Sequence, residues 1–568
     1  MRAGVRVRVA SPTQGDTQSS SQSAVDVDVA LVRELRENGF RSTRSTKLIC
    51  TIGPATSGYE QLEQLANNGM NVARLNMCHG DREWHREVIE RIRKMNEELG
   101  YSVAVMVDTE GSEVHIGDLG QPRSVQEGDE WTFTVRSIGS EQTSDAKIAE
   151  VSYDGFAEDV QAGDVILSDG GMVRFQIASV EGPDVKCVCI EPGILLPRSN
   201  LTYRRSGRLV RARNAMLPTI SAKDWVDIDF AVENGADFIA ISFVKTAETV
   251  KHLKSYLGSR CVPLGEETSD ENSAVSKDKT VGKDGKPAVI PGVVSKIESF
   301  DSIENIAEIV EASDAVMVAR GDLGAQIPLE DVPVIQQEIT RACRQFNKPC
   351  IVASHLLRSM LEHPTPTRAE VADIADAVQQ RADALMLSGE SAAGEHPMRC
   401  LDVLRTVATR TESFMQSGNH STGANPVHAK AFAPFPPRRE DNFDEQEFVS
   451  EGLTSSAAQL ADHLGASAIF VFTRRGYMAS LLSTNRPECP IFAFTNSHEV
   501  RRRMNLLWGV MPFRIDLYKD DPDTTVERTF RLMLTRGLIN EGDMVVVVSD
   551  VGPTTDDVRS IQVRYVKK

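Results

Sequence analysis

The chain has 568 residues, of which 41% are hydrophobic and 25% charged, and 63 basic against 81 acidic residues give a formal net charge of −18. This length exceeds one hydrophobic core and predicts about two to four domains, and the acidic balance argues against a nucleic-acid-binding body, which needs a basic face. No run approaches the roughly 18 apolar residues of a membrane-spanning helix, so we expect no membrane span. Nine scattered cysteines without metal-ligand spacing favour reduced thiols.

The N-terminal segment differs in composition from the rest of the chain. Its first 23 residues carry three arginines, five serines and a single acid, Asp16. An Arg- and Ser-rich, acid-poor start is typical of an organelle transit peptide, and an unimportant disordered tail is the alternative. We therefore expect residues 1–44 to be a disordered, transit-like segment.

Short apolar runs alternate with helix-like stretches from about residue 45 to about residue 410. Eight runs are found, at residues 47–53, 70–77, 102–108, 237–243, 291–298, 315–322, 349–355 and 384–390. Each is continuously apolar, as strands buried on both faces must be. Eight such units predict a (β/α)8 TIM barrel, a fold whose chemistry sits at the C-terminal ends of the strands.

Those strand ends carry polar side chains that a buried strand would otherwise avoid. They are Arg74, Asn76, Asp108, Ser242, Lys296, Glu298, Asp322, Ser354 and Glu390. The most informative are the ends of residues 293–299 and 318–324, because two carboxylates there could chelate one divalent cation beside an ammonium. The alternative is a pair of buried ion pairs, Lys296 with Glu298 and Arg320 with Asp322.

Four segments interrupt or follow the barrel, whose parts we place at residues 45–115 and 214–416. Residues 116–213 read as short antiparallel strands joined by turns, which predicts an inserted small β-barrel domain acting as a lid. Residues 258–288 are a polar insertion, and 417–448 a linker. Residues 449–568 alternate helices and strands as an open α/β domain, in which we expect Arg501, Arg502 and Arg503 to form a solvated or subunit-contacting face.

Several stretches resemble the pyruvate kinase family in sequence and in order. They are residues 46–56, 69–80, 221–228, 295–299, 319–324, 364–373, 386–392, 470–473 and 490–496. The resemblance runs from about residue 45 to the end. Residues 108–120 are similar to the plastid alpha-type members of plants and algae, which implies the chloroplast stroma, with the cytoplasm as the alternative.

The resemblance implies transfer of the phosphoryl group of phosphoenolpyruvate to ADP, giving ATP and pyruvate in glycolysis. It assigns Mg²⁺ to Glu298 and Asp322, and catalysis to Lys296, Arg74 and Ser354. Substrate binding adds Gly321 and Asp322, because glycine lets the backbone approach the substrate carboxylate. Phosphoryl transfer depends on positioning and charge neutralisation, which a lysine, an arginine fork and a metal supply.

The resemblance also implies a K⁺ site at Asn76, Cys78, Asp108 and Thr109. Cys78 stands where the family has serine, and a neutral thiol is a poor ligand for a hard cation. Glu113 occupies a position that tracks with monovalent-cation dependence in the family. We therefore expect K⁺ activation with weakened affinity.

Nucleotide binding is implied for Pro54, Arg74, His79, Lys223 and His115. His115 replaces an arginine of the family, and Glu110 stands where a lysine is usual. A neutral imidazole offers one donor against the arginine's charged fork. Both changes predict a more negative mouth, facing an anionic nucleotide.

Two alternatives remain open. One is a weakly active regulatory or structural alpha subunit of a hetero-oligomer, suggested by Cys78, Glu110, Ser112 and His115. The other, without the family, is a metal-dependent barrel lyase or aldolase acting on enolpyruvate. The resemblance implies a homo- or hetero-tetramer, or a larger oligomer with beta-type subunits.

Overall fold

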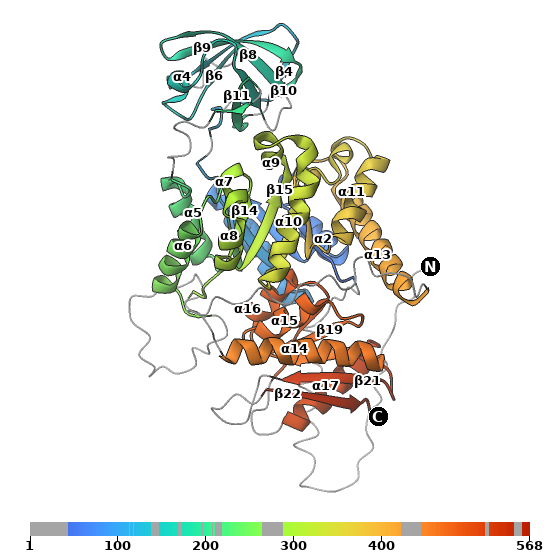
Figure 1. The fold of residues 1–568 in the computed structure, drawn as a ribbon. Helices are drawn as coiled ribbons and strands as arrows, with labels where there is room; N and C mark the ends of the chain where they lie inside the picture. Colours follow the sequence, from blue (N-terminus) through green and yellow to red (C-terminus); the bar gives the residue numbers. More distant parts are fainter. Residues whose placement is uncertain are drawn as a thin grey trace.

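The computed structural model describes residues 44–112, 114–117, 119–137, 147–168, 173–195, 197–206, 208–210, 218–263, 288–421, 445–516, 522–549 and 559–567. Glu113, nearly all of the N-terminal segment and most of the 258–288 insertion lie outside these residues. A β lid, a barrel and a C-terminal domain follow one another from top to bottom in Figure 1. Among the described residues, no helix combines the length and apolar character needed to cross a membrane.

Eight parallel strands close into a barrel in the order β1-β17-β16-β15-β14-β13-β3-β2. Their bounds are β1 Lys47–Thr51, β2 Val72–Asn76, β3 Ala104–Asp108, β13 Phe238–Ile241, β14 Gly292–Ile297, β15 Ala315–Ala319, β16 Cys350–Ala353 and β17 Ala384–Leu387. Each strand lies within one of the eight apolar runs. The predicted (β/α)8 barrel is therefore confirmed.

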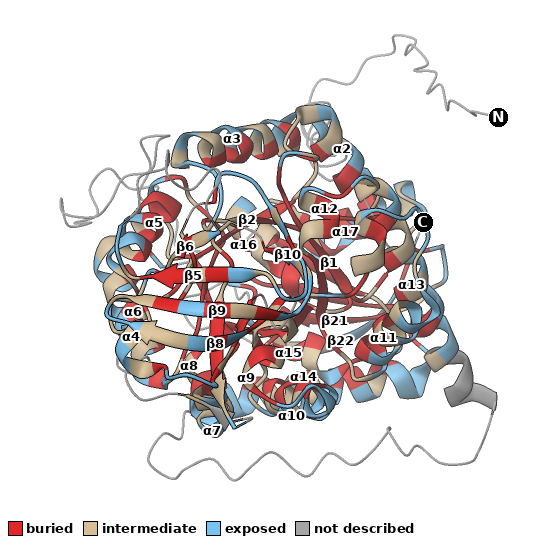
Figure 2. Ribbon diagram, turned by 90° about the horizontal axis from the view of Figure 1, so that it is seen from above, coloured by how far each residue is buried: buried red, intermediate tan, exposed pale blue. Residues whose placement is uncertain are grey.

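Helices cover the outside of the barrel, and Figure 2 shows buried residues along the strands and on the inward faces of the helices. The helices are α2 Tyr59–Asn67, α3 Arg82–Leu99, α5 Ala222–Glu233, α6 Ala247–Arg260, α7 Phe300–Glu304, α8 Ile306–Ala312, α9 Arg320–Gln326, α10 Val332–Gln345, α11 Arg368–Gln379, α12 Gly389–Ala392 and α13 Pro397–Ser421. In α3, the Asp81 carboxylate accepts the Trp84 N–H at the first turn. The helix ends at Gly100, whose φ of 72° suits a residue without Cβ.

Strand parity separates two apolar cores. Alternate strand residues such as Val72, Ala104 and Val294 point into the barrel and form its interior cluster. Their neighbours, such as Ala73 and Val105, pack outward against the helices. Side chains alternate along a strand. The residues two and four positions after Val72, Ala104 or Val294 must therefore also face the interior.

The lid is a β domain inserted between β3 and α5. Its strands are β4 Arg123–Val125, β5 Glu130–Thr134, β6 Ile148–Glu150, β7 Val165–Ser168, β8 Val173–Glu181, β9 Asp184–Glu191, β10 Gly193–Leu195, β11 Leu201–Arg205 and β12 Arg208–Leu209, with one short helix, α4 Phe156–Asp159. Seven strands form one sheet in the order β12-β11-β7-β8-β9-β5-β6, and β10 pairs with β4. Phe133, Phe156 and Phe175 are fully buried in its separate core.

The C-terminal domain is an open sheet in the order β20-β19-β18-β21-β22, with β22 antiparallel to β21 and the other pairs parallel. Its elements are α14 Glu445–Leu464, β18 Ala468–Phe472, α15 Tyr477–Asn485, β19 Ile491–Thr495, α16 His498–Arg503, the 3₁₀ helix η5 Met504–Leu506, β20 Val510–Arg514, α17 Pro522–Thr535, β21 Met544–Ser549 and β22 Ser560–Tyr565. Separate apolar clusters cover the two faces of the sheet. The predicted α/β domain is confirmed.

This domain closes the barrel at the end opposite the lid. Leu506 of η5 belongs to the interior barrel cluster. The arginines of α16 donate to barrel loops: Arg501 to the Gly100 carbonyl at 3.1 Å, Arg502 to the Asp237 carboxylate at 2.9 Å and Arg503 to the Ile290 carbonyl at 2.9 Å. The expected solvated or subunit-contacting face is therefore wrong, because these arginines dock the domain on the barrel of their own chain.

Candidate active site

Four ionisable side chains meet inside the lid-facing end of the barrel. They lie there because alternate strand residues face the interior. Arg74 follows Val72 by two residues, Asp108 follows Ala104 by four, and Lys296 and Glu298 follow Val294. The exposed fractions of these residues are 8% for Arg74, 0% for Asp108, 8% for Lys296 and 0% for Glu298. Charged groups buried this deeply must pair or bind a ligand.

Lys296 lies at the centre of this group. Its Nζ is 2.8 Å from Glu298 Oε1 and 3.2 Å from Asp108 Oδ1, and it donates to Ser242 Oγ at 2.8 Å. Burial alone would lower the pKa of Lys296, but Asp108 and Glu298 outweigh it and raise the pKa above its ordinary value. The ammonium is therefore permanently charged and held at the mouth.

Arg74 places a second permanent cation beside the first. Its Nε donates to Asp108 Oδ2 at 2.6 Å and its Nη1 to Thr51 Oγ1 at 3.0 Å. Burial would raise the pKa of Asp108, but Arg74 and Lys296 together hold it below its ordinary value. Asp108 thus fixes the relative positions of the two cations.

Glu298 and Asp322 form the candidate divalent-metal site. Glu298 Oε2 accepts the Phe243 N–H at 2.8 Å, and its buried Oε1 pairs with Lys296 Nζ at 2.8 Å. Burial raises the pKa of Glu298 to about 7, and the charge of Asp322 acts in the same direction. A buried and a half-buried carboxylate whose like charges repel each other fit a dication.

Asp322 does not pair with Arg320. Arg320 instead contacts Asp373 of α11 through both guanidinium nitrogens, at 2.6 and 2.8 Å. Asp322 accepts a hydrogen bond at 3.0 Å from Asn200 of the lid. The alternative of two ion pairs is therefore wrong for Arg320, while the Lys296–Glu298 pair is present. In the described ranges, no cluster of three His, Cys, Asp or Glu side chains could hold a metal ion.

Gly321 and Ser354 lie side by side at the ends of β15 and β16. A Cβ at Gly321 would be 3.5 Å from the Ser354 Cβ. Ser354 and His355 both have positive φ, 71° and 57°, which costs energy for residues with a side chain. Arg320 Nη2 donates to the Ser354 carbonyl at 2.6 Å, which holds this bend in place.

The candidate K⁺ residues lie on neighbouring strand ends, with Asn76 opposite Asp108 in register. The buried Asp108 Oδ1 accepts no hydrogen bond among the described residues, although Lys296 is nearby. The Thr109 carbonyl accepts the Ser242 hydroxyl at 2.7 Å. Burial raises the pKa of the Cys78 thiol to about 12, so the thiol is neutral. Three oxygens of this set fit a hard monovalent cation, and the sulfur does not.

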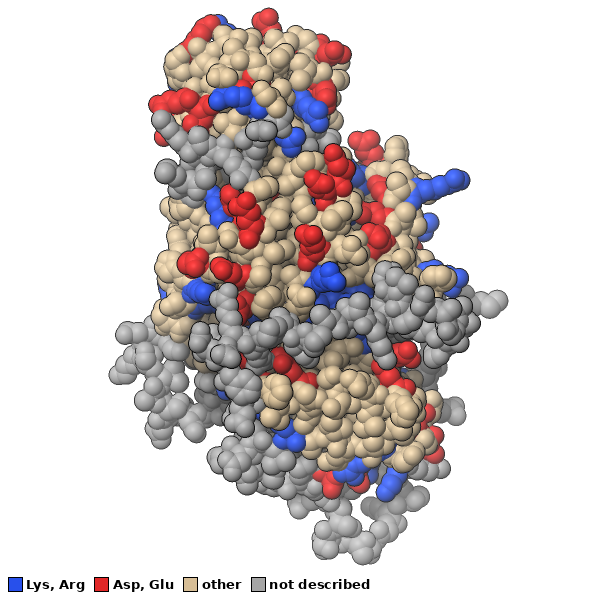
Figure 3. All heavy atoms as spheres, viewed as in Figure 1, with Lys and Arg blue, Asp and Glu red and all other residues tan. Residues whose placement is uncertain are grey.

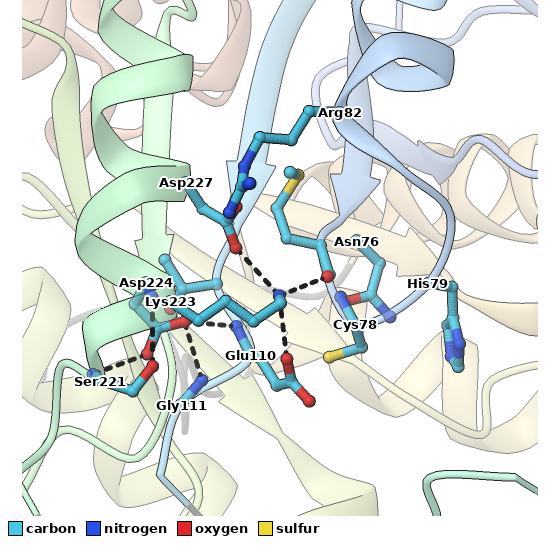
Figure 4. Close-up of polar contacts among 12 residues, drawn as sticks. Asn76, Cys78, His79, Arg82, Glu110, Gly111, Ser221, Lys223, Asp224 and Asp227 are labelled. Atoms are coloured by element: carbon cyan, nitrogen blue, oxygen red, sulfur yellow. Dashed lines mark hydrogen bonds and ion pairs between the residues drawn. The ribbon is translucent and has the colours of Figure 1, made fainter. Parts of the chain in front are cut away.

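Two of the candidate nucleotide residues, Lys223 and His115, lie beside one carboxylate, Glu110, and Figure 4 shows Lys223 directed at it. Arg74 instead contacts Asp108 and Thr51. Lys223 Nζ is 2.9 Å from Glu110 Oε2, and His115 Nε2 is 3.8 Å from Oε1. The lid residue Arg198 also pairs with Oε1. Burial lowers the pKa of His79, and Arg198 is the second cause, which indicates that these cations share one region. The predicted negative mouth is therefore offset, because Glu110 is enclosed by cations. Pro54 lies exposed after β1.

Three contributors to the site were missed in the residue assignments. Ser242 follows β13 and accepts from Lys296, and its position at a strand end was a usable signal. Arg198 and Asn200 come from the lid. A basic and an amide residue close together before β11 gave a weak signal, but their partners are in the barrel and no periodicity relates the two domains.

Comparisons with known proteins agree with this geometry. The family model "Pyruvate kinase, barrel domain" matches residues 43–263 and 275–401, and "Pyruvate kinase, alpha/beta domain" matches 451–559. The chain is 53% identical to "Pyruvate kinase isozyme A, chloroplastic" of Ricinus communis over 96% of this chain and 86% of that protein, and 53% identical to the same isozyme of Nicotiana tabacum over 96% and 85%.

Among solved structures, the chain is similar to a pyruvate kinase of Cryptosporidium parvum. The TM-score is 0.70 and the identity 28%, over 92% of this chain and 96% of that one. The barrel with its charged mouth, the two matched domains and the high identity over nearly the whole length lead to one conclusion. This chain belongs to the pyruvate kinase family.

Proposed function

We propose that this chain transfers the phosphoryl group of phosphoenolpyruvate to ADP, giving pyruvate and ATP, with Mg²⁺ and K⁺ as cofactors. The observation that carries the proposal is Lys296, charged and buried between Asp108 and Glu298 at the barrel mouth. Glycolytic activity in the plastid is supported by the relatives named chloroplastic. The complete set of barrel groups favours an enzyme over a purely structural subunit.

Neutralising the transferring group is the main task of the site. Lys296 acts as a point charge on the phosphoryl oxygens, and Arg74 binds phosphate through its planar fork. Asp108 keeps both cations in place before substrate arrives, so little reorganisation is needed during the reaction. Glu298 and Asp322 would hold Mg²⁺, which would supply Lewis-acid neutralisation of substrate oxygens.

The remaining step is protonation of the enolate left after transfer. Gly321 presents its backbone to the substrate carboxylate without a side chain. Ser354, held beside it in a strained bend, offers a hydroxyl that orients a proton-carrying water. Asn76, Asp108 and Thr109 would hold K⁺ through oxygen, and Cys78 would contribute little as a fourth ligand.

Nucleotide phosphates bind among Arg74, His79, Lys223 and His115, with Pro54 at the rim. The positive charges that enclose Glu110 support this assignment. For assembly, we propose a homo- or hetero-tetramer, or a larger oligomer with beta-type subunits. Relatives named plastidial pyruvate kinase, at 40% and 41% identity, represent further plastid isoforms.

The test is pyruvate formation by the purified full chain with phosphoenolpyruvate, Mg²⁺ and K⁺, with and without ADP. ADP-dependent pyruvate and ATP formation, lost in Lys296→Met, is the expected result. Pyruvate release that ignores ADP would mean that water takes the phosphoryl group as inorganic phosphate, and would replace the proposal with a phosphatase. Absence of ADP-dependent turnover would favour the metal-dependent lyase or aldolase. A folded chain that is silent alone but active with a beta-type subunit would identify the partner-dependent alternative.

A further inference from the structure

Three oxygen atoms lie within 3.0 Å of the Lys223 ammonium. Nζ donates to the Met77 carbonyl at 2.8 Å and to Asp227 Oδ2 at 3.0 Å, and it lies 2.9 Å from Glu110 Oε2. An ammonium has three donors, so an anionic ligand that binds Nζ competes with these oxygens. Glu110 contacts Nζ as an ion pair, whereas Met77 and Asp227 accept hydrogen bonds. Figure 4 shows Lys223 directed at both carboxylates.

Glu110 is held in this position by its own backbone. The N–H groups of Glu110 and Gly111 donate to Asp224 Oδ1 at 3.0 and 3.3 Å. Asp224 belongs to the capping box that begins α5 at Ser221. Gly111 has a φ of 84°, and a Cβ there would be 2.8 Å from the Ser242 Cβ, so this turn requires glycine. The Glu110 backbone is thus fixed and only its side chain can move.

The Glu110 side chain also links the lid to the barrel. Its Oε1 pairs with Arg198 of the lid while Oε2 faces Lys223 of the barrel helix α5. The side chain is 11% exposed. Burial would raise the pKa of Glu110, but Lys223 and Arg198 outweigh burial and lower the pKa below its ordinary value. The carboxylate therefore stays ionised. One internal anion therefore neutralises two cations from two domains.

We propose that Glu110 is a positioning residue that acts as an internal substitute for nucleotide phosphate, holding Arg198 and Lys223 until the phosphates of ADP displace it. The inference rests on the proposed function, since it takes the nucleotide to bind at Lys223. It deepens that function by naming a residue that sets nucleotide affinity. The phosphates and Glu110 are both anions that need the same donors, so they compete.

The chemistry of transfer is separate from this competition. Lys296 contacts Asp108, Glu298 and Ser242, and Arg74 contacts Asp108 and Thr51. Removing the Glu110 charge therefore changes the concentration of ADP that is needed, with little effect on kcat or on the KM for phosphoenolpyruvate. It also weakens the link between the lid and the barrel.

The experiment compares the full chain with Glu110→Gln, which keeps the shape and removes the charge. Initial rates against ADP at saturating phosphoenolpyruvate should give a KM for ADP lower on the order of tenfold. Neither kcat nor the KM for phosphoenolpyruvate should change beyond about twofold. The control is Glu191→Gln, which removes an exposed lid carboxylate paired with Arg174 at 2.9 Å and should leave all three constants unchanged.

Two readouts do not depend on turnover. Equilibrium dialysis of ADP with Mg²⁺ should show tighter binding to Glu110→Gln, and hydrogen exchange should be faster around Arg198. An unchanged or raised KM for ADP in an otherwise active Glu110→Gln would overturn the inference. An equal fall of the KM for ADP in Glu191→Gln would overturn it too. If the chain shows no ADP-dependent turnover and no ADP binding, the proposed function itself fails. If the chain turns over but Glu110→Gln leaves the KM for ADP unchanged, only the role of Glu110 is rejected.

Discussion

The ammonium of Lys296 and the carboxylate of Asp108 lie 3.2 Å apart across the barrel interior, although β13 separates their strands β14 and β3. Asp108 also pairs with Arg74 of β2 at 2.6 Å. One buried carboxylate therefore aligns two cations from different strands. Most of the chemistry we propose depends on this alignment.

Replacing Lys296 by Met should abolish phosphoryl transfer, by at least about a thousandfold, because the main cation facing the transferred group is lost. It also leaves Glu298 buried without its partner at 2.8 Å, which should lower the free energy of unfolding by about 3 kcal/mol. Pyruvate assays and urea unfolding measure the two effects. Lys186→Met is the matched control, since Lys186 forms an exposed lid pair with Glu181. Retained turnover in Lys296→Met would contradict the assignment.

Glu298→Gln should raise the Mg²⁺ concentration needed for half-maximal activity by about tenfold or more, because a neutral amide replaces a charged ligand. Binding of Mn²⁺, followed by electron paramagnetic resonance, reports the same loss without turnover. Glu308→Gln, an exposed change on α8, should have no effect. An unaltered Mg²⁺ requirement in Glu298→Gln would place the metal elsewhere.

Cys78→Ser should strengthen K⁺ activation. Its hydroxyl replaces a neutral thiol whose pKa burial raises to about 12, and oxygen suits a hard cation better than sulfur. We expect the K⁺ concentration for half-maximal rate to fall about threefold or more, within the range of a single ligand contact. Equal rates in Na⁺ and K⁺ for the unmodified chain would argue against a K⁺ site.

Lys47 should make stability depend on pH. Burial lowers the pKa of Lys47 from 10.5 to about 7, with Arg44 as the second cause, and its Nζ donates to the Val510 carbonyl at 2.6 Å. Between these pH values the unfolded chain binds the extra proton, so the free energy of unfolding rises with pH there and is flat below about 7. Lys47→Met should lose about 2 kcal/mol of this rise between pH 7 and about pH 9. The free energy of unfolding is measured by urea denaturation at each pH. If it changes with pH equally in the two proteins, the prediction is contradicted.

Leu506→Ala should loosen the closure of the barrel. The Leu506 side chain is 1% exposed and packs among interior strand residues, so its truncation leaves a cavity. The expected loss is about 3 kcal/mol in the free energy of unfolding, measured by urea denaturation. Leu329→Ala, at a side chain 74% exposed, is the control. Equal stability of the two variants would mean that Leu506 does not support the barrel.

The barrel and the charged residues of its mouth could be predicted because both depend on local patterns. A continuous apolar run ending in Lys296 and Glu298 indicates a buried strand and the end that carries the site. The partners of Arg320 and Glu110 could not be predicted. Asp373 and Arg198 lie on other elements, and the choice among several possible counter-ions depends on packing between elements, which no sequence period records.

The docking of the C-terminal domain was missed for the same reason, because three adjacent arginines look alike whether they face solvent or another domain. Arg502 holds Asp237 at 2.9 Å, and the other oxygen of Asp237 accepts the Val105 N–H at 2.9 Å. Val105 lies on β3, the strand that carries Asp108 three residues later. A displacement of the C-terminal domain would thus be transmitted along β3 from Val105 to Asp108, a distance of about 10 Å. Asp108, at the other end of this segment, aligns both cations of the phosphate site.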